Sequence, residues 1–364
     1  MGELAVVAEA LSVAVAARVP VLLWGAPGTG KTSVVSALAT ELGWPCEVVI
    51  ASIREPSDFA GLPVVDASTG GVNLAPPRWA QRLVAKGRGL LFLDEISTAP
   101  PAVQAALLRV VLERTVGDLA LPDDVAVVAA ANPPEQAADG WDLSPPLANR
   151  FCHLDWPTDH RAFADGMVGG FPPPAAAALP EDWRSGIPFQ RAMVGSFAIL
   201  RPALVCAVPA QSHLAGRGWP SPRSWETAAI LLAAAAAANV SEGVAQRLVL
   251  GTVGEGAGVE YLTWLIEADL PDPEAVLADP DSFVVPERGD RAFAALAAVA
   301  AAVAADNTIE RWNAGWRVLG RAGETAPDVA AIAARVLARC RPKGAQPPPE
   351  VKLFAPLLKQ AGLL

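Results

Sequence analysis

The chain has 364 residues and a formal net charge of −10, and 52% of its residues are hydrophobic while 18% are charged. This composition is typical of a globular protein and excludes a disordered one. The acidic balance argues against a protein that mainly grips DNA or RNA, because phosphate backbones are bound by basic surfaces. The longest apolar runs, residues 230–238 and 292–305, fall short of the ~20 residues that a membrane helix needs.

The chain contains four widely spaced cysteines, Cys46, Cys152, Cys206 and Cys340. They form no C-x-x-C pair and no zinc-binding spacing, and the three histidines form no metal-ligand pattern. We therefore expect reduced, buried thiols in a cytoplasmic protein, and no metal other than Mg²⁺.

Residues 1 to about 157 alternate between apolar strands and helices. An amphipathic helix is expected at the N-terminus. Apolar runs predict buried parallel strands at residues 20–24, 46–51, 89–93 and 125–131. Helices are expected between them, including residues 33–42 and 101–113. The pattern predicts an α/β fold, with a parallel sheet between layers of helices.

The first strand leads directly into a glycine-rich loop, Gly25-Ala26-Pro27-Gly28-Thr29-Gly30-Lys31-Thr32, followed by Ser33. The loop matches G-x-x-x-x-G-K-[ST], which holds nucleoside triphosphates. Its glycines let backbone N–H groups converge on phosphate oxygens at a helix N-terminus. Lys31 is expected to reach the β- and γ-phosphates, and the Thr32 hydroxyl to hold Mg²⁺.

Two further strands end in polar residues that suit nucleotide hydrolysis. The strand at residues 89–93 ends at Asp94 and Glu95, and parallel strands deliver such residues to the ligand-binding edge of the sheet. Asp94 would hold the Mg²⁺ shell, and Glu95 would orient and deprotonate the attacking water. Asn132 follows the strand at residues 125–131, where its amide can hydrogen-bond this water or the γ-phosphate.

Together these residues resemble the AAA+ ATPases over roughly residues 1–240. The resemblance implies an ATP-hydrolysing ring, usually a hexamer, with Walker A at residues 25–32, Walker B at Asp94 and Glu95, and sensor 1 at Asn132. Arg150, at the end of a short helix that begins near Ser144, resembles the arginine finger that a neighbouring subunit receives. Arg109 and Arg114 are weaker candidates for that role.

Further segments resemble parts of the MoxR-type (helix-2-insert) clade. Arg223, in Trp219-Pro220-Ser221-Pro222-Arg223, resembles sensor 2, which would reach the γ-phosphate of its own subunit. A hairpin is expected within about residues 53–77, and another within about residues 113–126. Composition changes after Pro157 and again at the proline-rich stretch near residue 270, which predicts three regions. We interpret them as an AAA+ core at residues 1–157, a helical lid at residues 158–270 and a helical C-terminal region at residues 271–364.

The leading interpretation is a MoxR-type ATPase that uses ATP and Mg²⁺ to remodel or activate a protein client. Clade members commonly work with a partner bearing a von Willebrand A-type domain. A nucleic-acid-remodelling motor stays open as an alternative, although the charge of −10 opposes it. A nucleotide-gated scaffold is a second alternative, and a small-molecule kinase is a distant one.

Overall fold

The computed structural model describes residues 2–133, 141–325 and 327–363. By contacts the chain divides into two compact units, Met1–Glu181 with Cys206–Val259, and Asp182–Val205 with Glu260–Leu364. The segment expected to form a lid, residues 158–270, therefore contributes to both units. The boundaries expected at residues 157 and 270 stay predictions.

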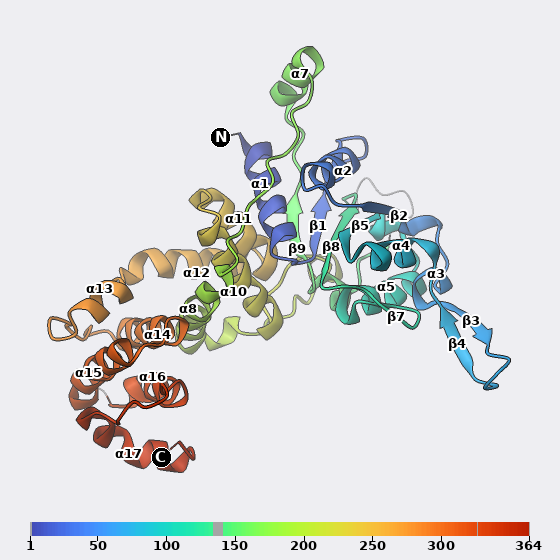
Figure 1. Cartoon of the computed structure of the whole chain (residues 1–364). Helices are drawn as coiled ribbons and strands as arrows, with labels where there is room; N and C mark the ends of the chain where they lie inside the picture. The colour runs from blue at the N-terminus through green and yellow to red at the C-terminus, as the bar shows by residue number, and fades with distance from the viewer. Residues whose placement is uncertain (1, 134–140, 326, 364) are drawn as a thin grey trace. The chain divides into compact units, whose positions relative to one another are not determined.

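The first unit contains a five-stranded sheet in which every strand pair is parallel, in the order β2-β5-β8-β1-β9 (Figure 1). The strands are β1 (Val21–Trp24), β2 (Cys46–Ile50), β5 (Arg88–Asp94), β8 (Asp124–Ala131) and β9 (Cys152–Asp155). The α/β class and four of the strands were predicted correctly. The strand β9 was missed, because it has only four residues and two of them are polar.

Helices pack around this sheet in the first unit. Their bounds are α1 (Glu3–Ala16), α2 (Lys31–Glu41), α3 (Ser57–Ala60), α4 (Arg78–Lys86), α5 (Pro101–Glu113), α6 (Pro145–Ala148), α9 (Ser212–Ala215), α10 (Pro222–Ala237) and α11 (Glu242–Val253). The core between the sheet and α5 includes Leu91, Leu93 and Leu107, all fully buried. The edge strand β2 differs from its prediction, because Val48 and Ile50 are exposed where a buried strand was expected.

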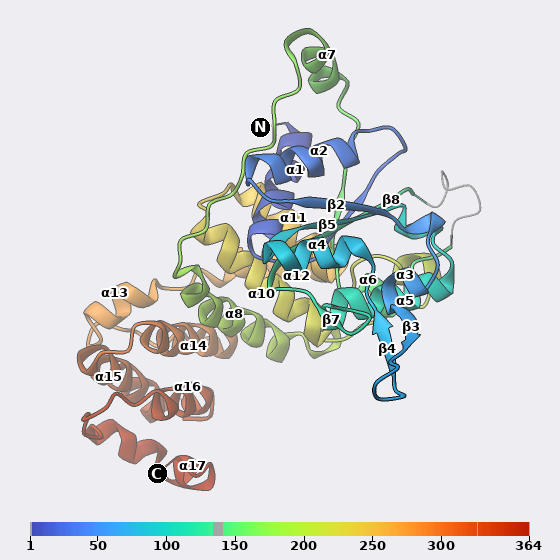
Figure 2. The same cartoon turned by 45° about the vertical axis from the view of Figure 1, so that its right-hand side comes forward.

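Two antiparallel hairpins lie beside each other on the first unit. The longer one joins β3 (Leu62–Val65) to β4 (Val72–Ala75) and extends beyond α3 (Figure 2), and the shorter joins β6 (Thr115–Val116) to β7 (Leu119–Ala120). Two hydrogen bonds between Leu74 and Asp118 join them. Leu74 N–H donates to the Asp118 carboxylate at 2.7 Å, and Asp118 N–H donates to the Leu74 carbonyl at 3.0 Å. The hairpins are therefore fastened together.

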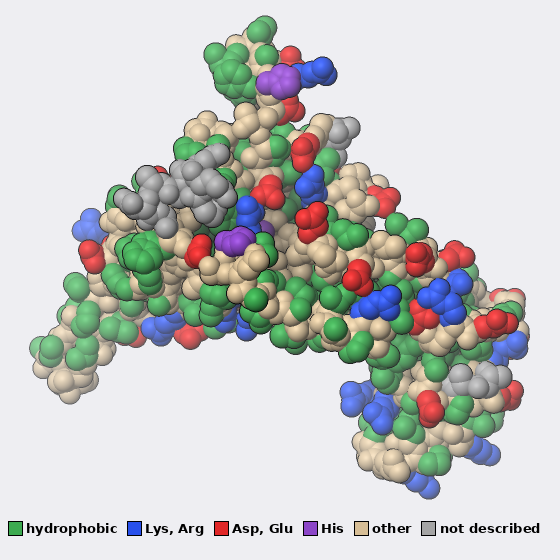
Figure 3. Space-filling view, turned by 180° about the vertical axis from the view of Figure 1, so that it is seen from behind, with side chains coloured by type: hydrophobic (Ala, Val, Ile, Leu, Met, Phe, Trp, Pro, Cys, Tyr) green, Lys and Arg blue, Asp and Glu red, His purple; other side chains and the backbone are tan. Residues whose placement is uncertain are grey.

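A short helix, α7 (His160–Gly169), follows β9 at the end of two extended segments. Asp159 caps its N-terminus by accepting hydrogen bonds from the N–H groups of Arg161 and Ala162. Apolar side chains of α7 and of the residues that follow it are exposed and gather at the top of the space-filling view (Figure 3). The largest are Phe163, Met167 and Val168 in the helix and Phe171 after it. Exposed apolar clusters commonly mark surfaces that contact other molecules.

The second unit is helical. It contains α8 (Ile187–Leu200), α13 (Pro273–Ala278), α14 (Gly289–Ala305), α15 (Ile309–Thr325), α16 (Pro327–Arg339) and α17 (Ala355–Gln360), and α12 (Glu255–Ala268) runs from the first unit into it. Trp312 and Trp316 lie in its core, 1% exposed, with ring centroids 6.0 Å apart. Within the described residues, no helix is both long enough and apolar enough to cross a membrane.

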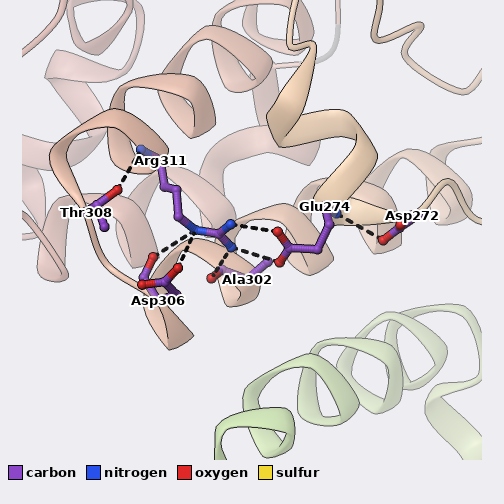
Figure 4. A network of polar contacts seen from close by, with 6 residues as sticks. All are labelled: Asp272, Glu274, Ala302, Asp306, Thr308 and Arg311. Carbon is purple, nitrogen blue, oxygen red and sulfur yellow. Dashed lines mark hydrogen bonds and ion pairs between the residues drawn. The ribbon is translucent and has the colours of Figure 1, made fainter.

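A polar network ties α13 to α15 within the second unit (Figure 4). The Arg311 guanidinium donates two hydrogen bonds to the Glu274 carboxylate, at 2.6 and 2.8 Å, and one to the Ala302 carbonyl at 3.1 Å. Its Nε donates to the Asp306 carbonyl at 2.9 Å. Arg311 therefore fastens the starts of two helices and the end of α14.

The cysteines are all free, but they are not all buried. Cys152 is buried, Cys46 and Cys340 are partly buried, and Cys206 is exposed. Burial raises the pKa of Cys152 to about 12, so this thiol stays protonated at neutral pH. The expectation of buried thiols is correct for Cys152 and wrong for Cys206, because Cys206 lies in an irregular segment between helices rather than in the core.

Candidate nucleotide site

The glycine-rich loop joins β1 to α2 and depends on its glycines at three positions. Gly28 and Gly30 have φ angles of 78° and 88°, which side chains disfavour. A Cβ at Gly25 would lie 2.9 Å from the Trp156 carbonyl oxygen, so only glycine fits there. Trp156 follows β9 and also donates its indole N–H to the Thr29 carbonyl at 3.0 Å. The loop is thus held in shape by the neighbouring strand.

Lys31, the first residue of α2, lies folded against the loop. Its Nζ donates to the carbonyls of Gly25 and Ala26, at 2.6 and 2.9 Å, and to Asn132 Oδ1 at 3.2 Å. Burial lowers the pKa of Lys31, and the nearby Asp94 carboxylate acts in the opposite direction. The ammonium group is therefore placed beside the loop, where a bound phosphate would replace the carbonyls as its partner.

The Thr32 hydroxyl and the Asp94 carboxylate meet at the start of α2 and the end of β5. Thr32 Oγ1 donates to Asp94 Oδ2 at 2.9 Å. Two oxygen ligands from a hydroxyl and a carboxylate fit Mg²⁺, which is commonly held by one or two protein oxygens together with substrate phosphates. In the described part of the chain no three His, Cys, Asp or Glu side chains form a separate metal cluster. Thr32 and Asp94 are therefore the residues that would hold the ion.

Glu95 follows Asp94 in an unusual backbone conformation. Its φ is 56°, in the left-handed region that non-glycine residues rarely adopt. This turn directs the side chain toward the end of β2, where the Ser52 hydroxyl donates a short hydrogen bond to Glu95 Oε2. Ser52 lies in the 3-10 turn Ala51–Ile53, directly after β2. The Glu95 carboxylate is thus held by a residue of the adjacent strand.

Asn132 follows β8 and joins the same edge of the sheet. Its Oδ1 accepts the hydrogen bond from Lys31, and its carbonyl accepts a longer one of 3.4 Å from the Ser97 hydroxyl. The structure therefore brings Lys31 and Thr32, at the start of α2, together with Asp94, Glu95 and Asn132 at the ends of β5 and β8. This arrangement can bind phosphate, hold a divalent cation and activate water.

Arg150 lies just beyond α6, away from this set of contacts. Its guanidinium donates to the Pro146 carbonyl, and it is partly buried. Burial lowers the pKa of Arg150, and the positive charge of Arg223 lowers it further, so the two guanidinium groups lie near each other. Arg223 itself is exposed in the first turn of α10. Both arginines come from the same chain and present positive charge to one region.

The two weaker finger candidates are engaged within the chain. Arg109 pairs with Glu113 one turn further along α5, at 2.9 Å. Arg114 ends the same helix and donates to the carbonyls of Pro122 and Val125. Arg114 therefore anchors the connection into β8.

Three residues of this region were not anticipated from the sequence, namely Ser52, His153 and Trp156. Trp156 and Ser52 belong to no motif, and their contacts reach across 127 and 43 residues of sequence. His153 was considered only as a metal ligand. His153 lies in β9, where it pairs with Leu22 of β1, and the sequence alone did not predict this strand.

Comparisons with known proteins find similarity in the first unit, where the candidate site lies. Residues 20–152 match the model of the "ATPase family associated with various cellular activities (AAA)". Among curated proteins, the transcriptional regulatory protein XylR of Pseudomonas putida is 31% identical over 132 residues, 35% of this chain and 23% of XylR. The Holliday junction branch migration complex subunit RuvB of Synechococcus sp. CC9605 is 40% identical over 77 residues, 21% of this chain and 17% of RuvB.

The chain spans less than two fifths of the length of the curated relatives that it matches. Among solved structures, a "putative ATPase" from Cytophaga hutchinsonii matches 67% of this chain and 79% of its own at 20% identity. The TM-score of this match is 0.44, which is too low to support a conclusion about this chain. The family model and the phosphate-binding loop agree: residues 20–152 form a P-loop ATPase domain of the AAA family.

Proposed function

We propose that this chain hydrolyses ATP with Mg²⁺ as a MoxR-type AAA+ ring, expected to be a hexamer, and uses that energy to remodel or activate a protein client. The observation that carries the proposal is the convergence of Lys31, the Thr32–Asp94 pair and Glu95 at one edge of the sheet. A water-activating carboxylate beside a phosphate-binding loop suits hydrolysis. A scaffold that only binds nucleotide would not need it.

Each residue has a defined part in this proposal. The loop from Gly25 to Thr32, with Ser33, cradles the phosphates, and Lys31 neutralises charge on them. Glu95 takes the proton of the attacking water, while Asn132 orients that water or the γ-phosphate. Arg150 acts on the nucleotide of a neighbouring subunit, and Arg223 responds to the γ-phosphate. Thr32 and Asp94 would hold Mg²⁺, which would supply positive charge to neutralise that on the phosphates.

The assignment to the MoxR type rests on the two fastened hairpins and on the resemblance of residues 53–77 and 113–126 to that clade. The β3–β4 hairpin exposes Leu62, Val64 and Val65, and α7 exposes a second apolar cluster. Such surfaces suit contacts with other subunits or with a protein partner. From the resemblance to the clade we also propose a partner with a von Willebrand A-type domain. We propose a cytoplasmic location because the four cysteines are widely spaced and form no disulfide or zinc pattern.

The direct test is ATP turnover across a protein concentration series, with sizing, for the wild type and for Arg150→Ala. The proposal expects turnover that rises with assembly and falls roughly 10³-fold or more in Arg150→Ala, while ATP binding is retained. Arg82→Ala is a matched control, since Arg82 pairs with Glu47 on the surface at 2.6 Å. Turnover that depends on neither concentration nor Arg150 would exclude a finger supplied by a neighbour.

A nucleic-acid motor is the second candidate, because the matched relatives include a branch migration subunit and a transcriptional regulator. The net charge of −10 opposes it, since binding to a phosphate backbone requires basic surface. Stimulation of ATP turnover by DNA that weakens steeply with salt would favour this candidate. Stimulation by a protein partner, without a response to DNA, would favour remodelling of a client.

A further inference from the structure

A buried polar link connects β1 to the end of α6. Trp24 Nε1 donates to His153 Nδ1 at 2.9 Å, and His153 Nε2 lies 2.9 Å from the Ala148 carbonyl oxygen. Trp24 and His153 are 5% and 7% exposed, and their rings lie nearly parallel with centroids 6.2 Å apart. Because a buried polar atom without a partner is costly, both ends of this link are held in place.

The partners fix the protonation of His153. The indole N–H can only donate, so Nδ1 must accept, and the single proton of the neutral ring lies on Nε2. Nε2–H therefore donates to the Ala148 carbonyl. Burial lowers the pKa of His153 to about 4, so the ring is neutral at physiological pH. The link thus has a defined direction, from the Trp24 indole through the imidazole to the Ala148 carbonyl.

Both ends of the link lie next to functional positions. Trp24 directly precedes Gly25 of the phosphate-binding loop, and Ala148 ends α6 two residues before Arg150. Asn149, between them, is tied to the start of α10, because its Nδ2 donates to the Trp219 carbonyl at 2.9 Å and its Oδ1 accepts from Ser221 Oγ at 2.7 Å. The backbone before Arg150 is therefore fixed from two sides.

We propose that His153 is a positioning residue for Arg150: by holding the Ala148 carbonyl, it sets the direction in which the turn presents the arginine to a neighbouring subunit. The inference rests on the proposed function, in which Arg150 acts on the neighbour's nucleotide. The Arg150 side chain itself touches only the Pro146 carbonyl among the hydrogen bonds of the described residues. Its placement consequently depends on the geometry of the turn.

Two substitutions separate the two halves of the link. An asparagine amide reaches about as far as Nδ1, so His153→Asn keeps an acceptor for the Trp24 indole and loses the bond to Ala148. A glutamine amide reaches about as far as Nε2, so His153→Gln keeps the donor to Ala148 and loses the acceptor. Each variant loses one buried hydrogen bond, of about 1 kcal/mol in stability. If His153 only stabilised the fold, the two variants should therefore lose stability and turnover to the same extent.

The test uses mixed rings of two defective proteins. A donor with Glu95→Gln offers a finger but does not hydrolyse, and an acceptor with Arg150→Ala hydrolyses only with a neighbour's finger. The mixture should regain turnover that neither protein shows alone. Adding His153→Asn to the donor should lower this turnover roughly 10- to 100-fold, the size expected of a misplaced catalytic group. Adding His153→Gln should lower it by no more than about threefold.

The reciprocal mixture distinguishes the finger from the subunit's own nucleotide site. His153→Asn placed in the acceptor, which lacks Arg150, should leave turnover and ATP affinity close to the parent mixture. Equal losses from donor and acceptor, or a loss from the acceptor alone, would overturn the proposal. If the parent mixture itself stays inactive while both proteins bind ATP and assemble, Arg150 is no finger in trans, and the role of His153 falls with it.

Discussion

The Ser52 hydroxyl donates a hydrogen bond to the Glu95 carboxylate, which is the group proposed to accept the proton of the attacking water. The two residues follow β2 and β5, adjacent parallel strands in which Ile50 pairs with Asp94. The left-handed backbone of Glu95, with φ of 56°, aims its side chain at Ser52 rather than along the strand. The hydrogen bond occupies one oxygen of the carboxylate, which is then less free to accept a hydrogen bond from the attacking water.

This contact predicts that Ser52→Ala raises ATP turnover. Removing the donor leaves one Glu95 oxygen free for the attacking water, and a hydrogen bond to a charged group is strong enough to change turnover by up to about tenfold. The measurement is steady-state turnover with nucleotide affinity determined separately. Affinity should not change, because Ser52 contacts neither Lys31 nor Thr32 in the described hydrogen bonds.

Ser68→Ala is a suitable control, since Ser68 bonds only to Asp66 at the tip of the β3–β4 hairpin. Unchanged turnover in Ser52→Ala would mean that the contact does not restrain Glu95. Lower turnover would mean that Ser52 instead holds Glu95 in its working position.

The second prediction concerns the fastening of the two hairpins. Gly117 and Gly70 both have positive φ angles, 60° and 71°, so alanine strains the backbone at either position. At Gly117 the new Cβ would also lie 2.4 Å from the Leu74 carbonyl oxygen, whereas at Gly70 nothing lies within 4 Å. Gly117→Ala should therefore lower the free energy of unfolding by about 1–3 kcal/mol more than Gly70→Ala.

Chemical denaturation of both variants gives this difference, and hydrogen exchange of the β4 backbone shows its location. Faster exchange at Leu74 in Gly117→Ala alone is expected, because its N–H is bonded to Asp118. Similar stability of the two alanine variants would show that the hairpins separate at little cost.

Strong local signals explain which parts of the fold could be predicted from the sequence. The strands β1, β5 and β8 are continuous apolar runs that lie in the middle of the sheet, so burial on both faces leaves a clear pattern. β9 has four residues, Cys-His-Leu-Asp, and its pairing with β1 is decided by packing rather than by its own sequence. The division into two compact units depends on contacts between distant segments, which no local pattern encodes.

The candidate site likewise contains some residues that the sequence reveals and others that it does not. Lys31, Thr32, Asp94 and Glu95 lie in motifs whose spacing has a direct chemical meaning, so the sequence alone marks each as a candidate. Ser52 and His153 are ordinary residues whose importance comes from what folds beside them. A serine after a strand or a lone histidine has many possible roles, and only the arrangement of β2, β5, β1 and β9 selects among them.

A third prediction concerns the polar network of the second unit. Arg311→Met keeps the aliphatic stem and removes four hydrogen bonds to Glu274, Ala302 and Asp306. Because Glu274 is 57% exposed and water screens the ion pair, we expect a loss of only about 1–2 kcal/mol. Hydrogen exchange should quicken in α13 and in the first turn of α15.

Arg317→Met is the matched control on the same helix. Its partner Asp281 lies 3.2 Å away, and the two side chains are 48% and 72% exposed, so the change should cost under about 0.5 kcal/mol. Equal effects from the two variants would mean that the bonds of Arg311 to backbone carbonyls add nothing.

The last prediction is a pH dependence of stability that originates at His153. Its pKa falls from 6.5 to about 4 on folding, chiefly through burial, with Arg217 lowering it and the Ala148 carbonyl and Asp155 acting in the opposite direction. Because the folded pKa is depressed, the unfolded chain binds more protons between these values. The stability that the neutral ring contributes is therefore fully present above pH 6.5 and is lost as pH falls toward 4.

The expected loss from this one group is about 2 kcal/mol between pH 7.5 and pH 5. Other groups titrate in the same range, so the quantity to measure is the difference in unfolding free energy between the wild type and His153→Gln at each pH. That difference should change by about 2 kcal/mol in favour of His153→Gln as pH falls, since glutamine has no proton to gain. A difference independent of pH would mean that folding leaves the pKa of His153 unchanged. The folded ring would then gain its proton by about pH 5, and the Trp24 indole could not donate to it.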